Sequence, residues 1–440
     1  MVPFIGGVFD GRFHHKPLDL NQRQIRLVQI LRAPAGASTG VRCKIENVSL
    51  DDKPVYKALS YTWGEPDPSS NIVIEGRLLS VRQNLYEFLT MAQSQPELSL
   101  PTRFWIDQIT IDQDNKIERN HQVQQMGDIY SNAEEVVIWL GQAFPGSGGL
   151  MTALQSRSSN LKNDRDSRLK PQNHRAALEQ VFDNSYWTRL WVCQEMLLAK
   201  RLQMYLGSRS LDLDTFDPNV SRRGGLLRTG EAEYADRLSV MLVVRGRSHF
   251  GEQGASQRSW HSVLLLTAGC QCSEPRDQVF ALLSMLGEVY QVPVNYRRSL
   301  REVWMTTVAK IAAGWIVEKS KEQMRIFVGV AWVLWNRLGL IHTTSSTAHG
   351  IAADSENDGS SEFLNSLEAV YQETWHRFHR DPRLPAKISR EAYRTILYSY
   401  IKLVLRRHKR TMARRHRPSL TDSSYIPAVL FPMVSFPMNT

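Results

Sequence analysis

The stretch FWIDQITIDQDN, residues 104–115, decides the fold prediction, because it begins like a buried strand and ends in polar residues. Its first eight residues, FWIDQITI (104–111), are mostly apolar and β-prone and predict a strand. A helix should follow, since Asn115 can act as an N-cap, Glu118 completes a capping box, and apolar residues from Val123 onward recur with helical spacing. The apolar run 134–141 then predicts a strand buried on both faces.

A strand, a helix and a second strand in this order indicate a right-handed βαβ unit and a parallel sheet. Ligands usually bind at loops on the carboxyl ends of such strands, so Asp107, Gln108, Asp112 and Gln113 are candidates for a site. The other predicted elements are strands at 25–31, 41–50 and 56–64, a hairpin over 72–81 turning at Glu75-Gly76, a helix from Leu85, a helix over 185–199 capped by Ser185, and a strand at 201–207.

The length of 440 residues allows two or three domains, and changes in composition suggest where they divide. Helical patterns recur at 233–244, 259–268, 274–287 and 301–317. We predict an N-terminal extension at 1–22 and an α/β domain at 23–210, which contains a mobile insertion at 142–184 with at most one helical piece. A helical region at 211–315 should pack on the α/β domain. The remaining segments are a divergent segment at 316–342, a linker at 343–362, and a helical segment with a basic tail at 363–440.

The net charge of +10 is concentrated near the C-terminus, because residues 402–417 hold eight lysines or arginines and no acid. Three interpretations of this tail stay open. It is a solvated helix face, a nuclear-targeting or nucleic-acid contact, or a segment attracted to an anionic membrane surface.

Several common classes of site are excluded by the motifs that the chain lacks. The four cysteines form no CxxC pair, which favours a reducing compartment and no zinc site. Asp112-Gln-Asp114-Asn-Lys116 has lysine where an EF-hand needs an oxygen, so we predict no metal site there. No P-loop, GxGxxG, HExxH or GxSxG motif occurs. With no secretory signal and no apolar run longer than the ten residues at 326–335, we expect a soluble, cytoplasmic protein without a transmembrane segment.

Six ordered blocks of the sequence resemble the fungal heterokaryon incompatibility (HET) domain. They are YKALSYTWG from Tyr56, the Asn84-Leu85 pair, FWIDQITIDQDN with Glu118-Arg119 and Gln122-Val123, the IY…A…VVIWLG run, YWTRLWVCQEMLLAK from Tyr186, and EPRDQVFALLSMLG with VNYRRS. The blocks cover roughly residues 23 to 310. The positions that match the family motif are Ser60, Asp107, Gln113, Glu118, Arg119, Gln122, Arg189, Gln194, Arg276 and Asp277.

The chain departs from the family at two places. The family's strand block has Cys and Asn where Thr110 and Asp112 stand, so no thiol role is carried over to this loop. The Pro-Ser-Trp block of many members is absent, so two interpretations of the chain after about residue 315 stay open, a divergent segment or the product of an imperfect gene model.

The resemblance implies a role in non-self recognition between fused fungal cells and the triggering of programmed cell death. It also implies a fold similar to Toll/interleukin-1 receptor (TIR) domains, a mostly parallel, flavodoxin-like sheet flanked by helices. Some TIR domains cleave NAD⁺ with a glutamate in a Trp-Cys-x-x-Glu-Leu helix. Trp191 and Glu195 have that spacing, although Val192 and Met196 replace the cysteine and the leucine.

Glu195 also stands out from its helix alone, because its predicted neighbours on the helix face are mostly apolar. Such surroundings raise the pKa of a carboxylate. Glu195 is therefore the candidate catalytic residue, which would stabilise an oxocarbenium-like ribose. The competing interpretation is a structural pair with a buried arginine, Arg189 or Arg276. The candidate ligand-binding residues are Tyr61, Trp63, Gly64, Asp107, Gln113 and Trp191.

Three functions remain open from the sequence: a signalling module, an NAD⁺ glycohydrolase, and an inactive or truncated family member. The first needs no cofactor, and the second takes NAD⁺ as its substrate. The expected partners are a second copy of the chain and an incompatibility partner. Localisation is predicted to be cytoplasmic, or nuclear if the tail acts as a targeting signal.

Overall fold

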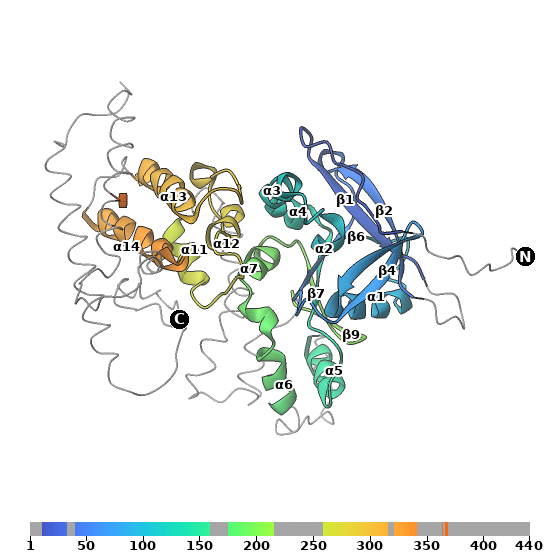
Figure 1. The fold of residues 1–440 in the computed structure, drawn as a ribbon. Coiled ribbons are helices and arrows are strands. Elements are labelled where there is room, and N and C mark those ends of the chain that lie inside the picture. Colours follow the sequence, from blue (N-terminus) through green and yellow to red (C-terminus); the bar gives the residue numbers. More distant parts are fainter. Residues whose placement is uncertain are drawn as a thin grey trace, which may run out of the picture. The chain divides into compact units, whose positions relative to one another are not determined.

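The computed structural model describes residues 11–32, 40–158, 175–214, 258–315 and 321–340, together with Phe363, Ser366 and Leu367. The predicted helix at 233–244, the linker at 343–362 and the basic tail at 402–417 lie outside these residues. The chain divides into two compact units, Met1–Gly251 and Glu252–Thr440 (Figure 1).

A nine-stranded sheet forms the centre of the first unit, in the order β5-β4-β2-β1-β6-β3-β7-β8-β9. The strands are β1 (Gln24–Ile30), β2 (Arg42–Ser49), β3 (Lys57–Tyr61), β4 (Ser69–Ile74), β5 (Arg77–Arg82), β6 (Arg103–Trp105), β7 (Glu135–Trp139), β8 (Leu202–Leu206) and β9 (Arg209–Asp212).

The sheet is mixed, which corrects the prediction of a mostly parallel sheet. Its central strands β6, β3, β7 and β8 are parallel neighbours, whereas β1 joins β2 and β6 by antiparallel pairing. The predicted βαβ order holds for β6 and β7, but β3 lies between them in the sheet. The chain therefore crosses over β3, and the carboxyl ends of β6, β3 and β7 point the same way.

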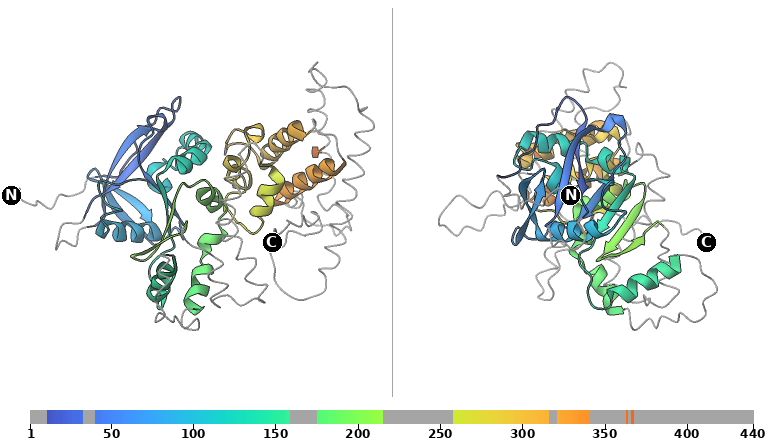
Figure 2. Two further views of the ribbon diagram at one scale, coloured as in Figure 1. Left: turned by 180° about the vertical axis from the view of Figure 1, so that it is seen from behind. Right: turned by 90° about the vertical axis from the view of Figure 1, so that its right-hand side faces the viewer.

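Helices cover both faces of this sheet (Figures 1 and 2). On one face, α1 packs its buried side chains against the core that also contains Tyr61 and Trp139. On the other face, Tyr130 of α4 donates to the Leu59 carbonyl at 3.1 Å, and Ser60 contacts Tyr186. The helices of this unit are α1 (Gln83–Ser94), α2 (Asp107–Thr110), α3 (Lys116–Gln124), α4 (Met126–Asn132), α5 (Ser147–Ser158), α6 (Arg175–Phe182) and α7 (Leu190–Leu197).

The hairpin predicted at 72–81 is confirmed, with its turn at the expected residues. β4 and β5 pair antiparallel around Glu75 and Gly76, whose φ angles are 50° and 83°. Two successive positive φ angles match the right-handed twist of a two-residue hairpin, and glycine adopts that region at no steric cost.

The strand predicted through residue 111 is wrong in its second half. β6 ends at Trp105, and α2 follows, with the Ile106 carbonyl accepting from the amides of Ile109 and Thr110. The Thr110 hydroxyl donates to the same carbonyl at 2.8 Å, so polar side chains favour a helical turn over the sheet ladder here.

The helix predicted after Asn115 consists of two helices, because α3 ends and α4 begins at Gln125. The Asn115 cap is confirmed, since its side chain accepts from the amides of Ile117 and Glu118. The predicted capping box is wrong, because the Glu118 carboxylate binds Arg26 and the Asp112 amide instead.

Replacing Asn115 by alanine is expected to lower the free energy of unfolding by about 1 kcal/mol, because two amide donors at the start of α3 lose their acceptor. Urea unfolding of the full chain measures this. Asn115→Asp keeps an acceptor and should lose much less, whereas equal losses in both variants would contradict a capping role.

The described part of the chain between β7 and β8 contains more helix than the sequence predicts. Two helices, α5 and α6, lie within the predicted insertion at 142–184, of which residues 159–174 lie outside the described part. Asn184, not Ser185, caps the next turn by accepting from the Tyr186 amide at 2.9 Å. The predicted helix at 185–199 is a 3₁₀ turn (Ser185–Thr188) followed by α7, and β9, which was not predicted, pairs with β8.

The second unit is helical over its described residues. Its elements are α11 (Trp260–Leu266), α12 (Asp277–Phe280), two 3₁₀ turns (Leu283–Met285 and Glu288–Tyr290), α13 (Leu300–Trp315) and α14 (Lys321–Arg337). α14 falls in the predicted divergent segment and includes the apolar run 326–335. No helix among the described residues is long and apolar enough to cross a membrane.

Candidate functional site

A cluster of aromatic and charged side chains lies at the carboxyl ends of β3 and β6. These strands are parallel neighbours, so Tyr61 at the end of β3 and Asp107 just after β6 fall at the same edge of the sheet. Such an edge is where open α/β sheets usually bind ligands. We call Ser60, Asp107, Arg189 and Glu195 the strand-end cluster.

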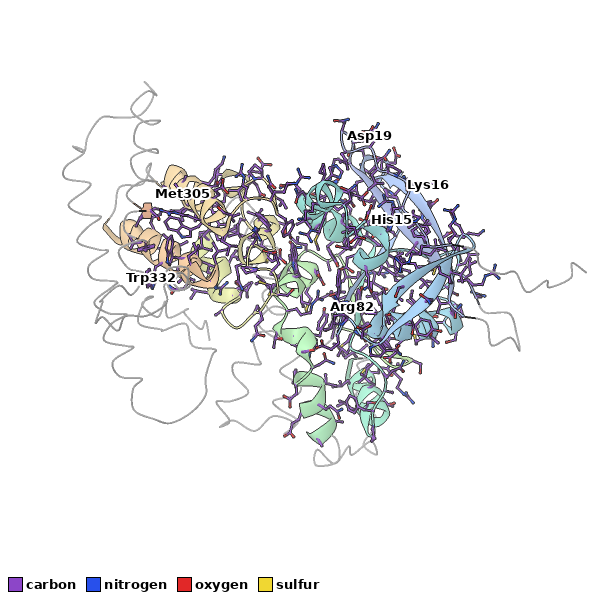
Figure 3. All side chains as sticks on the ribbon, in the orientation of Figure 1. His15, Lys16, Asp19, Arg82, Met305 and Trp332 are labelled. Carbon is purple, nitrogen blue, oxygen red and sulfur yellow. The ribbon has the colours of Figure 1, made fainter. Side chains whose placement is uncertain are left out.

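Trp63 and Asp107 connect the two strand-end loops directly. The Trp63 indole Nε1 donates to the Asp107 carboxylate at 2.7 Å. Arg82 stacks its guanidinium 5.0 Å from the centre of the Trp63 ring and donates to the Gly64 carbonyl. Gly64 has a φ of 74°, which places its carbonyl toward Arg82 (labelled in Figure 3) at no steric cost.

Asp107 is held in place by its own loop. Its carboxylate accepts from the Gln108 amide at 2.7 Å, and its carbonyl accepts from the Gln113 side chain at 2.9 Å. Burial raises the pKa of Asp107, and the nearby Arg189 cation and the Trp63 hydrogen bond oppose that rise. Gln113 therefore supports the loop, and its amide donor is already used on the backbone.

Glu195 lies beneath this edge, with only 3% of its surface exposed. Ser60 donates to its carboxylate, and the Ser60 hydroxyl is 2.7 Å from the Tyr186 hydroxyl. Burial raises the pKa of Glu195 to about 7, although Arg189 and the Ser60 hydrogen bond partly offset the rise. Burial therefore favours the protonated form of Glu195 over its charged form.

Arg189 supplies the positive charge of the cluster. It is the residue between the 3₁₀ turn and α7, and its guanidinium donates to the Tyr61 carbonyl at the end of β3. Burial opposes its charged form, but the Glu195 and Asp107 carboxylates outweigh that cost and raise the pKa of Arg189. One half-buried cation thus faces two carboxylates, which fits a site able to hold or move a proton.

The structural interpretation of Glu195 therefore has Arg189 as its partner. The other arginine considered, Arg276, lies in the second unit, where it binds the Glu274 carboxylate at 2.6 Å and the Arg298 carbonyl at 2.7 Å. Asp277 next to it accepts from the Tyr296 hydroxyl at 2.6 Å. The Arg276-Asp277 pair holds its own unit together.

Three of the six candidate ligand residues, Tyr61, Trp63 and Asp107, are brought together at the strand ends. Gly64 adjoins them through Arg82, and the Gln113 side chain donates to the Asp107 backbone carbonyl. Trp191 is half-buried and lies one helical turn before Glu195 on α7. Sequence reasoning missed Arg82 and Tyr186 as site residues, because each reaches the site only through the fold.

Other residues of the family motif stabilise the fold and are not part of the strand-end cluster. Arg26 and Glu118 form a buried pair with an Nη1 to Oε1 distance of 2.6 Å, and Arg26 also donates to the Thr110 carbonyl at 2.9 Å. Gln122 donates to the Gln24 carbonyl at 2.7 Å, which fastens α3 to β1. Arg119 and Gln194 lie on α3 and α7. Arg26, which the sequence did not single out, fixes the end of α2 and so the loop that carries Asp107.

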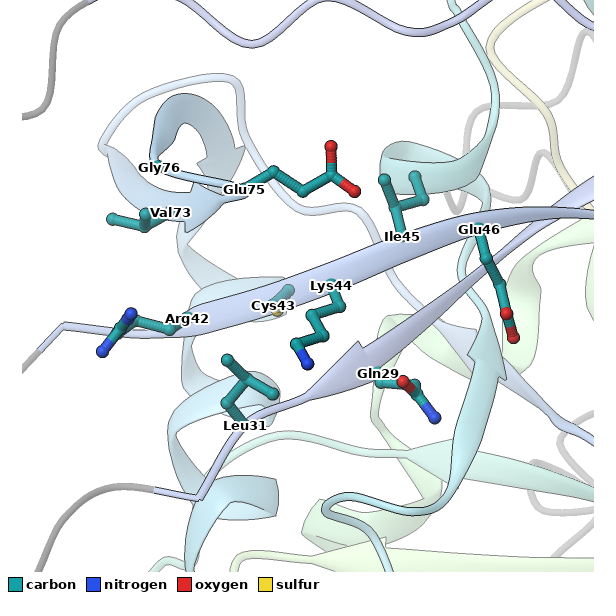
Figure 4. Close-up of a pocket in the computed structure, with 10 residues that line it drawn as sticks. All are labelled: Gln29, Leu31, Arg42, Cys43, Lys44, Ile45, Glu46, Val73, Glu75 and Gly76. Atoms are coloured by element: carbon teal, nitrogen blue, oxygen red, sulfur yellow. The ribbon is translucent and has the colours of Figure 1, made fainter.

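The described residues contain no group of three or more His, Cys, Asp or Glu side chains that could hold a metal ion. A groove of about 440 Å³ lies elsewhere in this unit, on the strands β1, β2 and β4 (Figure 4). Gln29, Arg42, Lys44, Glu46 and Glu75 line it among others. Because it lies away from the strand-end cluster, it does not extend that site.

The fold and the cluster define an α/β domain with a charged, partly buried centre at the carboxyl edge of its parallel strands. Residues 56–195 match the sequence model of a family described as Heterokaryon incompatibility protein (HET). The matched stretch is similar to this family, and it contains all four residues of the strand-end cluster.

One curated relative shares part of the sequence. The heterokaryon incompatibility protein 6, OR allele, of Neurospora crassa is 35% identical over 142 residues, which is 30% of this chain. The match spans 20% of the length of that relative. No solved structure matches the chain.

Proposed function

We propose that the chain acts in heterokaryon incompatibility, as a cytoplasmic HET domain protein that responds to non-self and triggers programmed cell death. The observation that carries this proposal is the family match over residues 56–195, which includes every residue of the strand-end cluster. The printed name of the Neurospora crassa relative supports the same role. In this proposal the partners are a second copy of the chain and an incompatibility partner.

The proposal includes a TIR-like signalling mechanism. Its support is the run of parallel strands β6, β3, β7 and β8, with charged loops at their carboxyl ends. The antiparallel strands on both sides of this run are additions to a TIR-like core. No cofactor is needed for a mechanism that works by self-association.

A second candidate function is NAD⁺ glycohydrolase, and one observation favours it. The pKa of Glu195 is raised to about 7 by burial, beside Ser60 and Arg189. In such a reaction water replaces nicotinamide on the ribose, and a carboxylate at this place would stabilise the positive charge on the sugar. Because only 3% of Glu195 is exposed, the side chains around it would have to move before a ligand could reach its carboxylate.

One experiment tests the proposed function and separates it from the second candidate. The full chain is expressed from an inducible promoter in a filamentous fungus, and viability and cellular NAD⁺ are followed together for the wild type, Glu195→Ala and Glu195→Gln. We expect the wild type to kill. Death that persists in both variants with unchanged NAD⁺ would exclude the enzyme. A wild-type chain without toxicity would contradict the proposed role and favour an inactive or truncated family member.

A further inference from the structure

The loop after β3, residues 62–64, carries Trp63 to its contact with the Asp107 carboxylate. β3 ends at Tyr61, where its pairing with β7 also ends. Within the described part of the chain, the backbone of residues 62–64 makes no hydrogen bond to another backbone group. Backbone carbonyls that are turned away from water need a partner, so side chains have to hold this loop in place.

The side chains that hold the loop come from the end of β5 and the start of α1. The Arg82 guanidinium (labelled in Figure 3) lies 5.0 Å from the centre of the Trp63 ring. The Asn84 side-chain Nδ2 donates to the Thr62 carbonyl at 2.5 Å. The Arg82 amide also donates to the Gln108 side chain at 3.3 Å. This segment therefore contacts both loops that carry the strand-end cluster.

The Asn84 side chain is also fixed to the core of the sheet. Its Oδ1 accepts from the Trp139 indole at 2.9 Å, and its backbone carbonyl accepts from the same N–H at 3.2 Å. Trp139 ends β7 and has no exposed surface. The Asn84 amide thus connects a fixed position in the core to the Thr62 carbonyl of the loop.

An asparagine amide suits these two partners, because one of them needs an acceptor and the other needs a donor. Its oxygen serves the Trp139 indole and its nitrogen serves the Thr62 carbonyl, which also determines how the amide is oriented. An aspartate of the same shape keeps the acceptor and loses the donor. This gives a role to the polar member of the Asn84-Leu85 pair, whereas Leu85 lies in the hydrophobic core.

We propose that Asn84 is a positioning residue of the strand-end cluster, which holds the Thr62 carbonyl so that the Trp63 indole meets the Asp107 carboxylate. Without the Asn84 donor the loop loses its connection to the core of the sheet, and the bond between Trp63 and Asp107 opens more often. That this contact serves cell killing rests on the proposed function.

The indole N–H signals of Trp63 and Trp139 test the positioning role in the full chain labelled with ¹⁵N-tryptophan. The variants Trp63→Phe and Trp139→Phe assign the two signals. In Asn84→Asp the Trp63 N–H should exchange with water about tenfold faster, because one hydrogen bond contributes about that factor to keeping the loop closed. The Trp139 N–H should still exchange slowly, because the introduced carboxylate accepts from it.

Two further variants complete the exchange experiment. Gln83→Glu makes the same amide-to-acid change one residue earlier, where the side chain contacts Ser70 and Glu87, and it should leave the Trp63 exchange unchanged. Asn84→Ala covers the case in which the charge introduced by Asn84→Asp disturbs folding. It removes both the donor and the acceptor, so both indole N–H groups should exchange faster. Unchanged Trp63 exchange in either Asn84 variant, or an equal acceleration in Gln83→Glu, would overturn the proposal.

Killing by the same chains in a filamentous fungus tests the connection to the proposed function. At equal abundance, Asn84→Asp should lose killing, whereas Gln83→Glu should kill like the wild type. A wild-type chain that does not kill would contradict the proposed function, and the exchange experiment would still decide the positioning role. Full killing by Asn84→Asp together with faster Trp63 exchange would overturn the inference that this position serves killing.

Discussion

Replacing Glu118 by alanine is expected to lower the free energy of unfolding by about 3–5 kcal/mol, because it leaves the Arg26 guanidinium buried without its counter-charge. The side chains of Arg26 and Glu118 are 1% and 3% exposed, and two hydrogen bonds of 2.6 and 2.9 Å join them. Glu118 also accepts from the Asp112 amide at 2.8 Å. Chemical unfolding of the full chain at pH 7 measures the loss.

Two controls distinguish the effect of the buried Arg26–Glu118 pair from the effect of removing any surface charge. Glu46→Ala removes a partly exposed partner of Arg103 and should cost less than about 1 kcal/mol. The double variant Arg26→Met, Glu118→Leu removes both buried charges and should recover most of the stability. A loss below 1 kcal/mol in Glu118→Ala would show that Arg26 finds water or another partner.

Replacing Glu195 by glutamine is expected to stabilise the protein at pH 8. The pKa of Glu195 is about 7 in the folded chain, against 4.5 for an ordinary glutamate. Between pH 4.5 and about pH 7, the folded chain keeps a proton on Glu195 that the unfolded chain has lost. The free energy of unfolding therefore falls as the pH rises through this range. Above pH 7 the wild type bears the full cost of burying a charged carboxylate, on the order of 3 kcal/mol. The Glu195→Gln variant has no charge at this position and avoids that cost.

Unfolding free energies at pH 5 and pH 8 test this expectation. The wild type and Glu195→Gln should differ little at pH 5 and most at pH 8, with the variant more stable. Glu87→Gln, which changes a half-buried glutamate of α1, serves as the matched control and should not alter the pH dependence in this way. Parallel pH curves for the wild type and Glu195→Gln would mean that Arg189 fully offsets the burial of Glu195.

Local patterns in the sequence predicted local structure well. The Glu75-Gly76 turn and the Asn115 cap depend on residues within a few positions of one another, and both are confirmed. The partner of Glu118 could not be predicted, because Arg26 is 92 residues away and the i to i+3 spacing favours a capping box. The mixed sheet was missed for a similar reason, since the antiparallel pairing of β1 with β6 leaves no periodic signal.

The residues of the strand-end cluster also divide into those that local sequence patterns predicted and those that only the folded structure brings together. Asp107 and Trp63 could be placed at one edge, because parallel strands bring their carboxyl ends together. Glu195 stood out as a carboxylate on an apolar helix face, which its burial in the structure confirms. Tyr186 and Arg82 were missed, because their contacts with Ser60 and Trp63 arise only when the helix and the hairpin pack on the sheet.

We propose that the strand-end cluster of the HET-like stretch triggers cell death, and the survival of cells expressing Asp107→Asn tests this proposal most directly. This change removes the charge that faces Arg189 but keeps an acceptor for Trp63. Asp112→Asn in the same loop is the control, and the amount of full-length chain is measured in each strain. The account predicts survival with Asp107→Asn and death with the wild type and Asp112→Asn. Equal killing by all three chains at equal abundance would contradict it.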